Sequence, residues 1–160
     1  MDKLQPTKPI VEILRPESYL ALIRNSVGST TWRQMYASVN GREQDIMNNG
    51  DLSCAFFVSS ILKMCDLLPQ LSVTVFGLIR NLEALHWQKV SEAKPGDILV
   101  WETIIDEKSD KHSHIGFYLG QEQAVSNSAV TKTIQQHHWT FDSSRTITAI
   151  YRPLWEPADS

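Results

Sequence analysis

The sequence has little of what marks several protein classes. Its 160 residues include only 2 cysteines, 7 glycines and 7 prolines. Two cysteines are too few for a disulfide framework, and the glycine and proline content excludes a collagen-like or low-complexity chain. Hydrophobic residues make up 42% of the chain, which is enough for a packed core. We therefore expect one compact folded domain.

Charge of one sign and long apolar runs are also scarce. The 15 Lys and Arg against 18 Asp and Glu give a formal net charge of −3, without the basic stripe typical of nucleic-acid binding, so we expect no nucleic-acid partner. The longest apolar stretches, such as 71–79, fall short of the roughly 18 to 20 residues that span a bilayer, so we expect no membrane span. The sequence leaves the oligomeric state open.

The N-terminus does not have the pattern of a secretory signal. Asp2, Pro6 and Pro9 stand where such a signal has a basic start and an unbroken apolar run. We therefore expect a cytoplasmic protein, or one exported by a route without a recognisable signal.

Residue patterns along the chain predict an α+β domain over residues 16–154. Prolines predict an extended arm over 1–15, and 155–160 is expected to be a frayed tail. Apolar spacing predicts a helix over 16–25, and a helix buried on all sides over 54–68. The segment 26–51 is expected to be mostly loop. A short helix is expected within 71–90. Apolar runs predict antiparallel strands at 98–101, 114–120, 123–130 and 146–154.

Cys54 starts the buried helix. The free N–H groups and the positive dipole end of a helix lower the pKa of a thiol placed there and favour the nucleophilic thiolate. A lone cysteine at this place also fits plain core packing. Cys65 lies about 16 Å further along the helix axis, beyond disulfide reach. We expect both thiols to be free and Cys65 to be a small buried apolar residue.

His114 opens a predicted strand in which Gly116 and Tyr118 share its face. Gly116 leaves space on that face, where a helix carrying a nucleophile can approach. Taken alone, a histidine in a strand is more often structural than catalytic.

Four segments, taken in chain order, resemble the NlpC-type papain-like cysteine peptidases, many of which cleave peptide bonds in bacterial cell-wall stems. They span about residues 16–152: the early helix before SVGSTTWRQMY, then DLSCAFFV, KPGDILVW and SHIGFYLG. The resemblance implies a papain-like fold, with the central helix near the N-terminus packed on an antiparallel sheet. It also implies a thiol-dependent amidase or peptidase acting on a peptide or amide, with Cys54 as nucleophile and His114 as general base.

The sequence also departs from the family pattern around the cysteine. Bulky Phe56 stands where the family usually has glycine, which reshapes the groove or abolishes activity. Ser53 precedes the cysteine, and Tyr36 is the nearest candidate for a tyrosine that often shapes the family's site, so both are expected to contact substrate. A catalytically inactive papain-like domain that binds a peptide or partner is the alternative function.

A third polar residue is needed to orient the histidine. The family's position, about twelve residues after the histidine, is occupied here by Ser126. A two-residue turn between the strands places Asn127 opposite Gly116, whereas a three-residue loop places Ser126 there. We predict Asn127, because its carboxamide oxygen is the better acceptor.

A metal site is the rival chemistry. His112 and His114 share a strand face, and His137 and His138 lie further along the chain. No cysteine or carboxylate pairing completes a familiar ligand spacing, so we expect neither a metal nor another cofactor.

Overall fold

The computed structural model describes residues 8–105 and 110–155 of the chain. It confirms the α+β class, with helices packed on an antiparallel sheet. The elements are α1 (Arg15–Asn25), β1 (Tyr36–Val39), β2 (Arg42–Asp45), α2 (Cys54–Met64), α3 (Val75–Ala84), β3 (Gln88–Lys89), β4 (Ile98–Ile105), β5 (Lys111–Gly120), β6 (Gln123–Ser128), β7 (Thr133–His138) and β8 (Ile147–Arg152).

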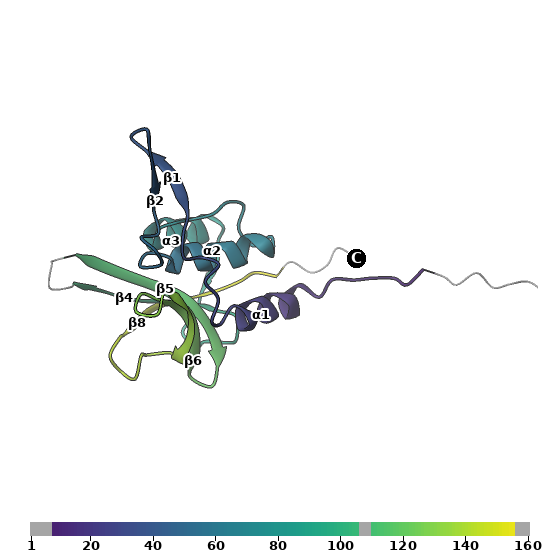
Figure 1. The fold of residues 1–160 in the computed structure, drawn as a ribbon. Helices are drawn as coiled ribbons and strands as arrows, with labels where there is room; N and C mark the ends of the chain where they lie inside the picture. The colour runs from purple at the N-terminus through teal and green to yellow at the C-terminus, as the bar shows by residue number, and fades with distance from the viewer. Residues whose placement is uncertain (1–7, 106–109, 156–160) are drawn as a thin grey trace, which may run out of the picture.

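Six strands form the main sheet in the order β3-β8-β4-β5-β6-β7. Strands β4 to β7 follow one another as a meander, and β8 returns to lie between β3 and β4. Helices α2 and α3 lie together over the sheet, and the separate hairpin β1–β2 projects beyond them (Figure 1). The strand order therefore departs from the chain order, because the last strand adds beside β4, the first strand of the meander.

Helix α1 is fixed to the sheet by a buried tyrosine. A proline in its first turn suits the helix start, and Tyr19 is 1% exposed. The Tyr19 hydroxyl donates to the carbonyl oxygen of Gly96 at 2.8 Å, and its ring meets Phe117 edge to face at 5.7 Å. The helix is thus tied to the turn that begins β4.

Helix α2 is the central helix, as its apolar sequence predicts. Phe57, Val58, Ile61 and Leu62 are each at most 1% exposed. The helix ends at Met64 rather than at residue 68. The cause is Asp66, whose φ of 55° leaves the helical region. Cys54 and Cys65 are both free thiols, as expected, but Cys65 is only partly buried.

The sequence analysis missed a hairpin and one strand of the main sheet. The hairpin β1–β2 lies inside the segment expected to be loop, and its turn is Asn40-Gly41, with φ of 52° and 78°. An Asn-Gly pair is a strong hairpin signal, so this element was detectable. Strand β7 is mostly polar and has one fully buried apolar residue, Ile134; its alternation is too weak to recognise.

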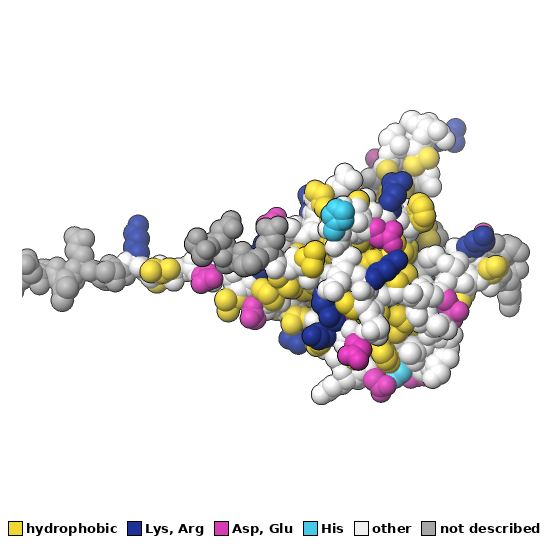
Figure 2. Space-filling model, turned by 180° about the vertical axis from the view of Figure 1, so that it is seen from behind, with side chains coloured by type: hydrophobic (Ala, Val, Ile, Leu, Met, Phe, Trp, Pro, Cys, Tyr) yellow, Lys and Arg dark blue, Asp and Glu magenta, His cyan; other side chains and the backbone are white. Residues whose placement is uncertain are grey.

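Residues 8–14 form neither helix nor strand and are exposed; residues 1–7 of the expected arm, and the expected tail after Trp155, lie outside the described residues. The Trp155 ring packs against Tyr19 at 5.3 Å. Basic and acidic side chains lie among one another on the face shown in Figure 2. Within the described ranges, no helix is long and apolar enough to cross a membrane.

Candidate active site

Cys54 and His114 line the same cleft, which has a volume of about 1010 Å³. Cys54 is the first residue of α2, and His114 lies on β5 together with three cleft-lining neighbours, residues 111–113. Helix α2 packs on β5 and β6. The structure therefore brings together the two side chains that the sequence analysis selected.

The Cys54 thiol is buried, with 9% of the residue exposed. Desolvation raises its pKa above the ordinary value. Hydrogen bonds from the N–H groups of Ala55 and Ile115 and the positive charge of Arg145 act in the opposite direction, but they do not offset the burial. The expectation of a lowered thiol pKa is thus wrong, because the helix start lies under packed side chains and not at the open surface.

The pKa of His114 is lowered to about 3. Desolvation is the largest cause, followed by the charge of Arg145 and then His137. The ring of His114 lies 5.2 Å from that of Trp101. Near neutral pH, the imidazole and the Cys54 thiol are both uncharged, so the resting pair is not a thiolate–imidazolium pair.

Arg145 is held at the cleft by backbone carbonyl groups. Its guanidinium donates to the carbonyl oxygen of Glu102 at 3.2 and 3.0 Å and to that of His112 at 2.7 Å. Its charge lowers the pKa of both Cys54 and His114. Arg145 was not singled out by the sequence analysis, since nothing in its local pattern distinguishes it from a surface arginine.

Ser126, and not Asn127, contacts the histidine. Nε2 of His114 lies 2.9 Å from Oγ of Ser126, and the same Oγ lies 2.8 Å from Nε2 of His137. The Asn127 side chain instead donates to the carbonyl oxygen of Gly50 at 2.7 Å. The strand register pairs Gly116 with Ser126, so the register that predicted Asn127 opposite Gly116 is wrong.

An extra residue in β5 causes this register. The turn has two residues, as expected, because Gly120 pairs with Gln123, but Tyr118 pairs with Ala124. Leu119 is therefore an unpaired bulge residue. Without the bulge, Val125 would move to the His114 face and Ser126 would enter the core beneath α2. Val125 is 0% exposed, and burying a valine contributes about 1.5–3 kcal/mol, which favours the bulged register.

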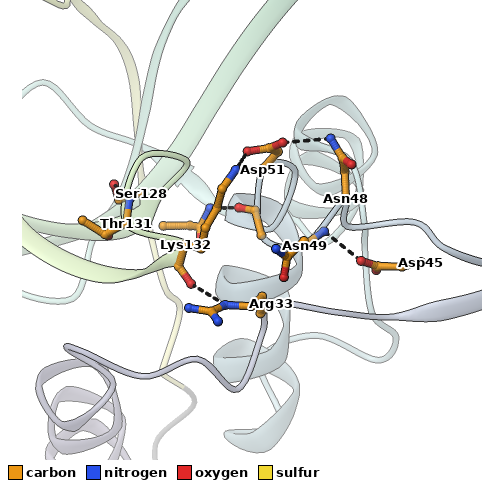
Figure 3. A network of polar contacts seen from close by, with 10 residues as sticks. Arg33, Asp45, Asn48, Asn49, Asp51, Ser128, Thr131 and Lys132 are labelled. Carbon is orange, nitrogen blue, oxygen red and sulfur yellow. Dashed lines mark hydrogen bonds and ion pairs between the residues drawn. The ribbon is translucent and has the colours of Figure 1, made fainter.

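A polar network holds the loop before Cys54 against the turn between β6 and β7 (Figure 3). Lys132 pairs with Asp51, and Arg33 donates to the carbonyl oxygen of Lys132 at 3.1 Å. A bond from Asn127, on β6, to Gly50 ties the same loop to the strand beside this turn. Asn127 thus holds the Cys54 loop in place instead of touching His114.

Two residues expected to bind substrate lie away from the cleft. Tyr36 is 61% exposed and begins β1, where it borders a shallow hollow formed by the hairpin. Ser53 is 0% exposed, and its hydroxyl has no hydrogen-bond partner within the described part of the chain. Neither residue lines the cleft that holds Cys54. Phe56 does not line it either, so its bulk does not fill the space beside the thiol.

The cleft has an apolar rim. Four of its lining side chains are large, apolar and exposed: Leu52 at 50%, Phe76 at 77%, Ile104 at 45% and Val130 at 91%. In residues 8–105 and 110–155, no group of three His, Cys, Asp or Glu side chains is arranged to hold a metal ion.

No protein-family model and no curated protein sequence matches this chain. Among solved structures, NlpC2 from Trichomonas vaginalis is similar, with a TM-score of 0.57 and 16% sequence identity over 92% of this chain. The chain has an NlpC-like fold. It spans 49% of the length of NlpC2, about half, and at this identity the likeness concerns the fold alone.

Proposed function

We propose that this chain is a cysteine hydrolase that cleaves an amide or peptide bond, with Cys54 as the nucleophile and His114 as the general base. The observation that carries the proposal is the single cleft lined by both side chains. The NlpC-like fold supports it, since it is the fold that the sequence motifs imply for such an enzyme.

The reaction begins with two uncharged groups. Desolvation raises the pKa of the Cys54 thiol and lowers that of His114, and both shifts disfavour proton transfer before the reaction. The thiol proton therefore moves to the imidazole only in the same step in which the sulfur attacks the carbonyl carbon. The charge of Arg145 favours the thiolate during this step. The N–H groups of Cys54 and Ala55, beside the sulfur at the start of α2, are donors for the carbonyl oxygen as it gains negative charge.

Collapse of this intermediate forms the acyl-enzyme. The imidazolium of His114 returns its proton to the leaving nitrogen, the C–N bond breaks and a thioester to Cys54 remains. Water, deprotonated by His114, then attacks the thioester, which releases the acid and restores the thiol. Neither step requires a cofactor.

Bacterial cell-wall stem peptides are the first substrates to test, because the resemblance in sequence implies them. Purified stem peptides are incubated with the protein, and the products are analysed by mass spectrometry. Replacing Cys54→Ala or His114→Gln is expected to reduce turnover by a factor on the order of a thousand or more. Cys65→Ala is the matched control, since this second free thiol lies at the other end of α2, and it is expected to retain full turnover.

A binding module without catalysis is the second candidate, favoured by the raised pKa of the Cys54 thiol. Intact stem peptides together with Cys54-dependent hydrolysis of p-nitrophenyl acetate would indicate a different amide substrate. Absence of both activities would refute the hydrolase and favour the binding module.

A further inference from the structure

We propose that Ser126 and His137 are positioning residues for His114, forming a directional hydrogen-bond chain that keeps the histidine proton on Nε2 and leaves Nδ1 as the base. The catalytic meaning of this chain rests on the proposed function. The direction of the chain follows from the contacts of His137 and Ser126 and from the neutral ring of His137.

The chain starts at His137. Nδ1 of His137 lies 2.8 Å from the carbonyl oxygen of His138. A carbonyl oxygen can only accept, so Nδ1 carries a proton. The neutral imidazole has one N–H group, which leaves Nε2 of His137 as an acceptor. Burial lowers the pKa of His137 and so keeps this ring neutral near pH 7.

Ser126 lies between the two histidines, and its single proton decides which nitrogen donates and which accepts. Its Oγ lies 2.8 Å from Nε2 of His137 and 2.9 Å from Nε2 of His114. The hydroxyl has a single proton, and the bare Nε2 of His137 takes it as acceptor. The oxygen therefore accepts from Nε2–H of His114. Nδ1 of His114 then has a free lone pair, and it is the nitrogen that receives the thiol proton from Cys54.

Packing holds the rings in this arrangement. The His137 ring stacks on Phe141 with a centroid distance of 4.0 Å and an angle of 17°. Ser126 is 1% exposed, so water does not compete for its hydroxyl. A methyl group at Gly116 would lie 2.8 Å from Cβ of Ser126, so the strands approach closely only because this residue is glycine.

The opposite direction would remove the base. With its proton on Nε2, His137 would donate to Ser126, and Ser126 would donate to Nε2 of His114. The proton of His114 would then lie on Nδ1, and that nitrogen would have no lone pair for the thiol proton. The tautomer of His137 is therefore the observation that decides the proposal.

The test is nitrogen-15 NMR of the histidine rings at pH 7, with each ring assigned from its loss in a single variant. The expected result is an Nδ1–H tautomer for His137 and an Nε2–H tautomer for His114. His137 in the Nε2–H form, or His114 in the Nδ1–H form, overturns the proposal. This readout needs no substrate, so it remains informative even if the protein proves not to be a hydrolase.

Kinetics test the coupling between the two positions. Ser126→Ala and His137→Phe are each expected to lower kcat for a Cys54-dependent reaction between tenfold and a hundredfold, a part of the usual contribution of a general base. Because they break one chain, the double variant is expected to be no slower than Ser126→Ala. His138→Phe is the control; it keeps the carbonyl group that His137 uses and is expected to keep the wild-type kcat. Multiplicative losses in the double variant would overturn the proposal.

Discussion

Holding His114 uncharged has a consequence for stability that is open to measurement. In the unfolded chain this imidazole titrates near pH 6.5, whereas in the folded protein its pKa is about 3. Between pH 3 and pH 6.5, the imidazole of the unfolded chain therefore binds a proton more readily than that of the folded protein. The stability that His114 contributes is thus fully present above pH 6.5 and is lost as the pH falls toward 3.

The size of the loss follows from these two values. At pH 5 the pH lies about 1.5 units below the pKa of the imidazole in the unfolded chain, so protonation stabilises the unfolded state. At ~1.4 kcal/mol per unit, this lowers the free energy of unfolding by about 2 kcal/mol. This figure changes little for any folded pKa below about 4. It is an upper value, because His114 keeps some exposure at the cleft and solvent weakens the effect.

Urea unfolding at pH 7 and pH 5 measures this difference. The wild-type protein is expected to lose about 2 kcal/mol more than His114→Gln over this interval, because the variant has no imidazole to protonate at this position. Cys54→Ala, a change in the same cleft, should keep the wild-type pH dependence. Equal losses in the wild type and His114→Gln would show that the folded imidazole titrates normally, and the account of a neutral pair would be wrong.

Four further variants test other parts of the site. Arg145→Gln is expected to raise the pH at which iodoacetamide alkylates Cys54, since the lost charge favoured the thiolate; an unchanged alkylation profile contradicts this. Gly116→Ala places a methyl carbon 2.6 Å from a carbonyl oxygen of the facing strand and should cost about 1–3 kcal/mol in urea unfolding; full stability would show that the strands separate easily. Asn127→Ala removes a buried hydrogen bond and should cost about 1–3 kcal/mol, with faster alkylation of Cys54 as its loop loosens; a slower rate would refute the role assigned to this side chain. Phe76→Ser should reduce the ratio of kcat/KM for p-nitrophenyl hexanoate to that for the acetate, because the exposed ring borders the cleft; an unchanged ratio would place the acyl chain elsewhere.

The sequence predicts most of the elements because their signals are local. The helix from Cys54 shows in its apolar run, and the strand of His114 shows in its apolar residues. The resemblance of four segments to one family, and not these two elements alone, selected the pair of side chains that line the cleft. The Asn40-Gly41 turn was an equally local signal for the hairpin, and it was overlooked.

The details that were missed depend on tertiary packing. The register that brings Ser126 to His114 results from burial of Val125 beneath α2, and a turn length alone does not reveal the bulge at Leu119. His137 lies on a strand with too few apolar residues to recognise. The raised pKa of Cys54 depends on how many atoms cover the helix start, whereas the sequence shows only that a helix starts there.

The contacts between the Cys54 loop and the β6–β7 region affect how this protein is made. Asn127 and Gly50, which are joined by a hydrogen bond, are 77 residues apart in the chain. During translation, Cys54 leaves the ribosome well before the segments that hold its loop and carry His114. The thiol of the new chain therefore lacks these contacts until nearly the whole domain has emerged, and any oxidation that begins earlier takes place on a cysteine outside the folded cleft.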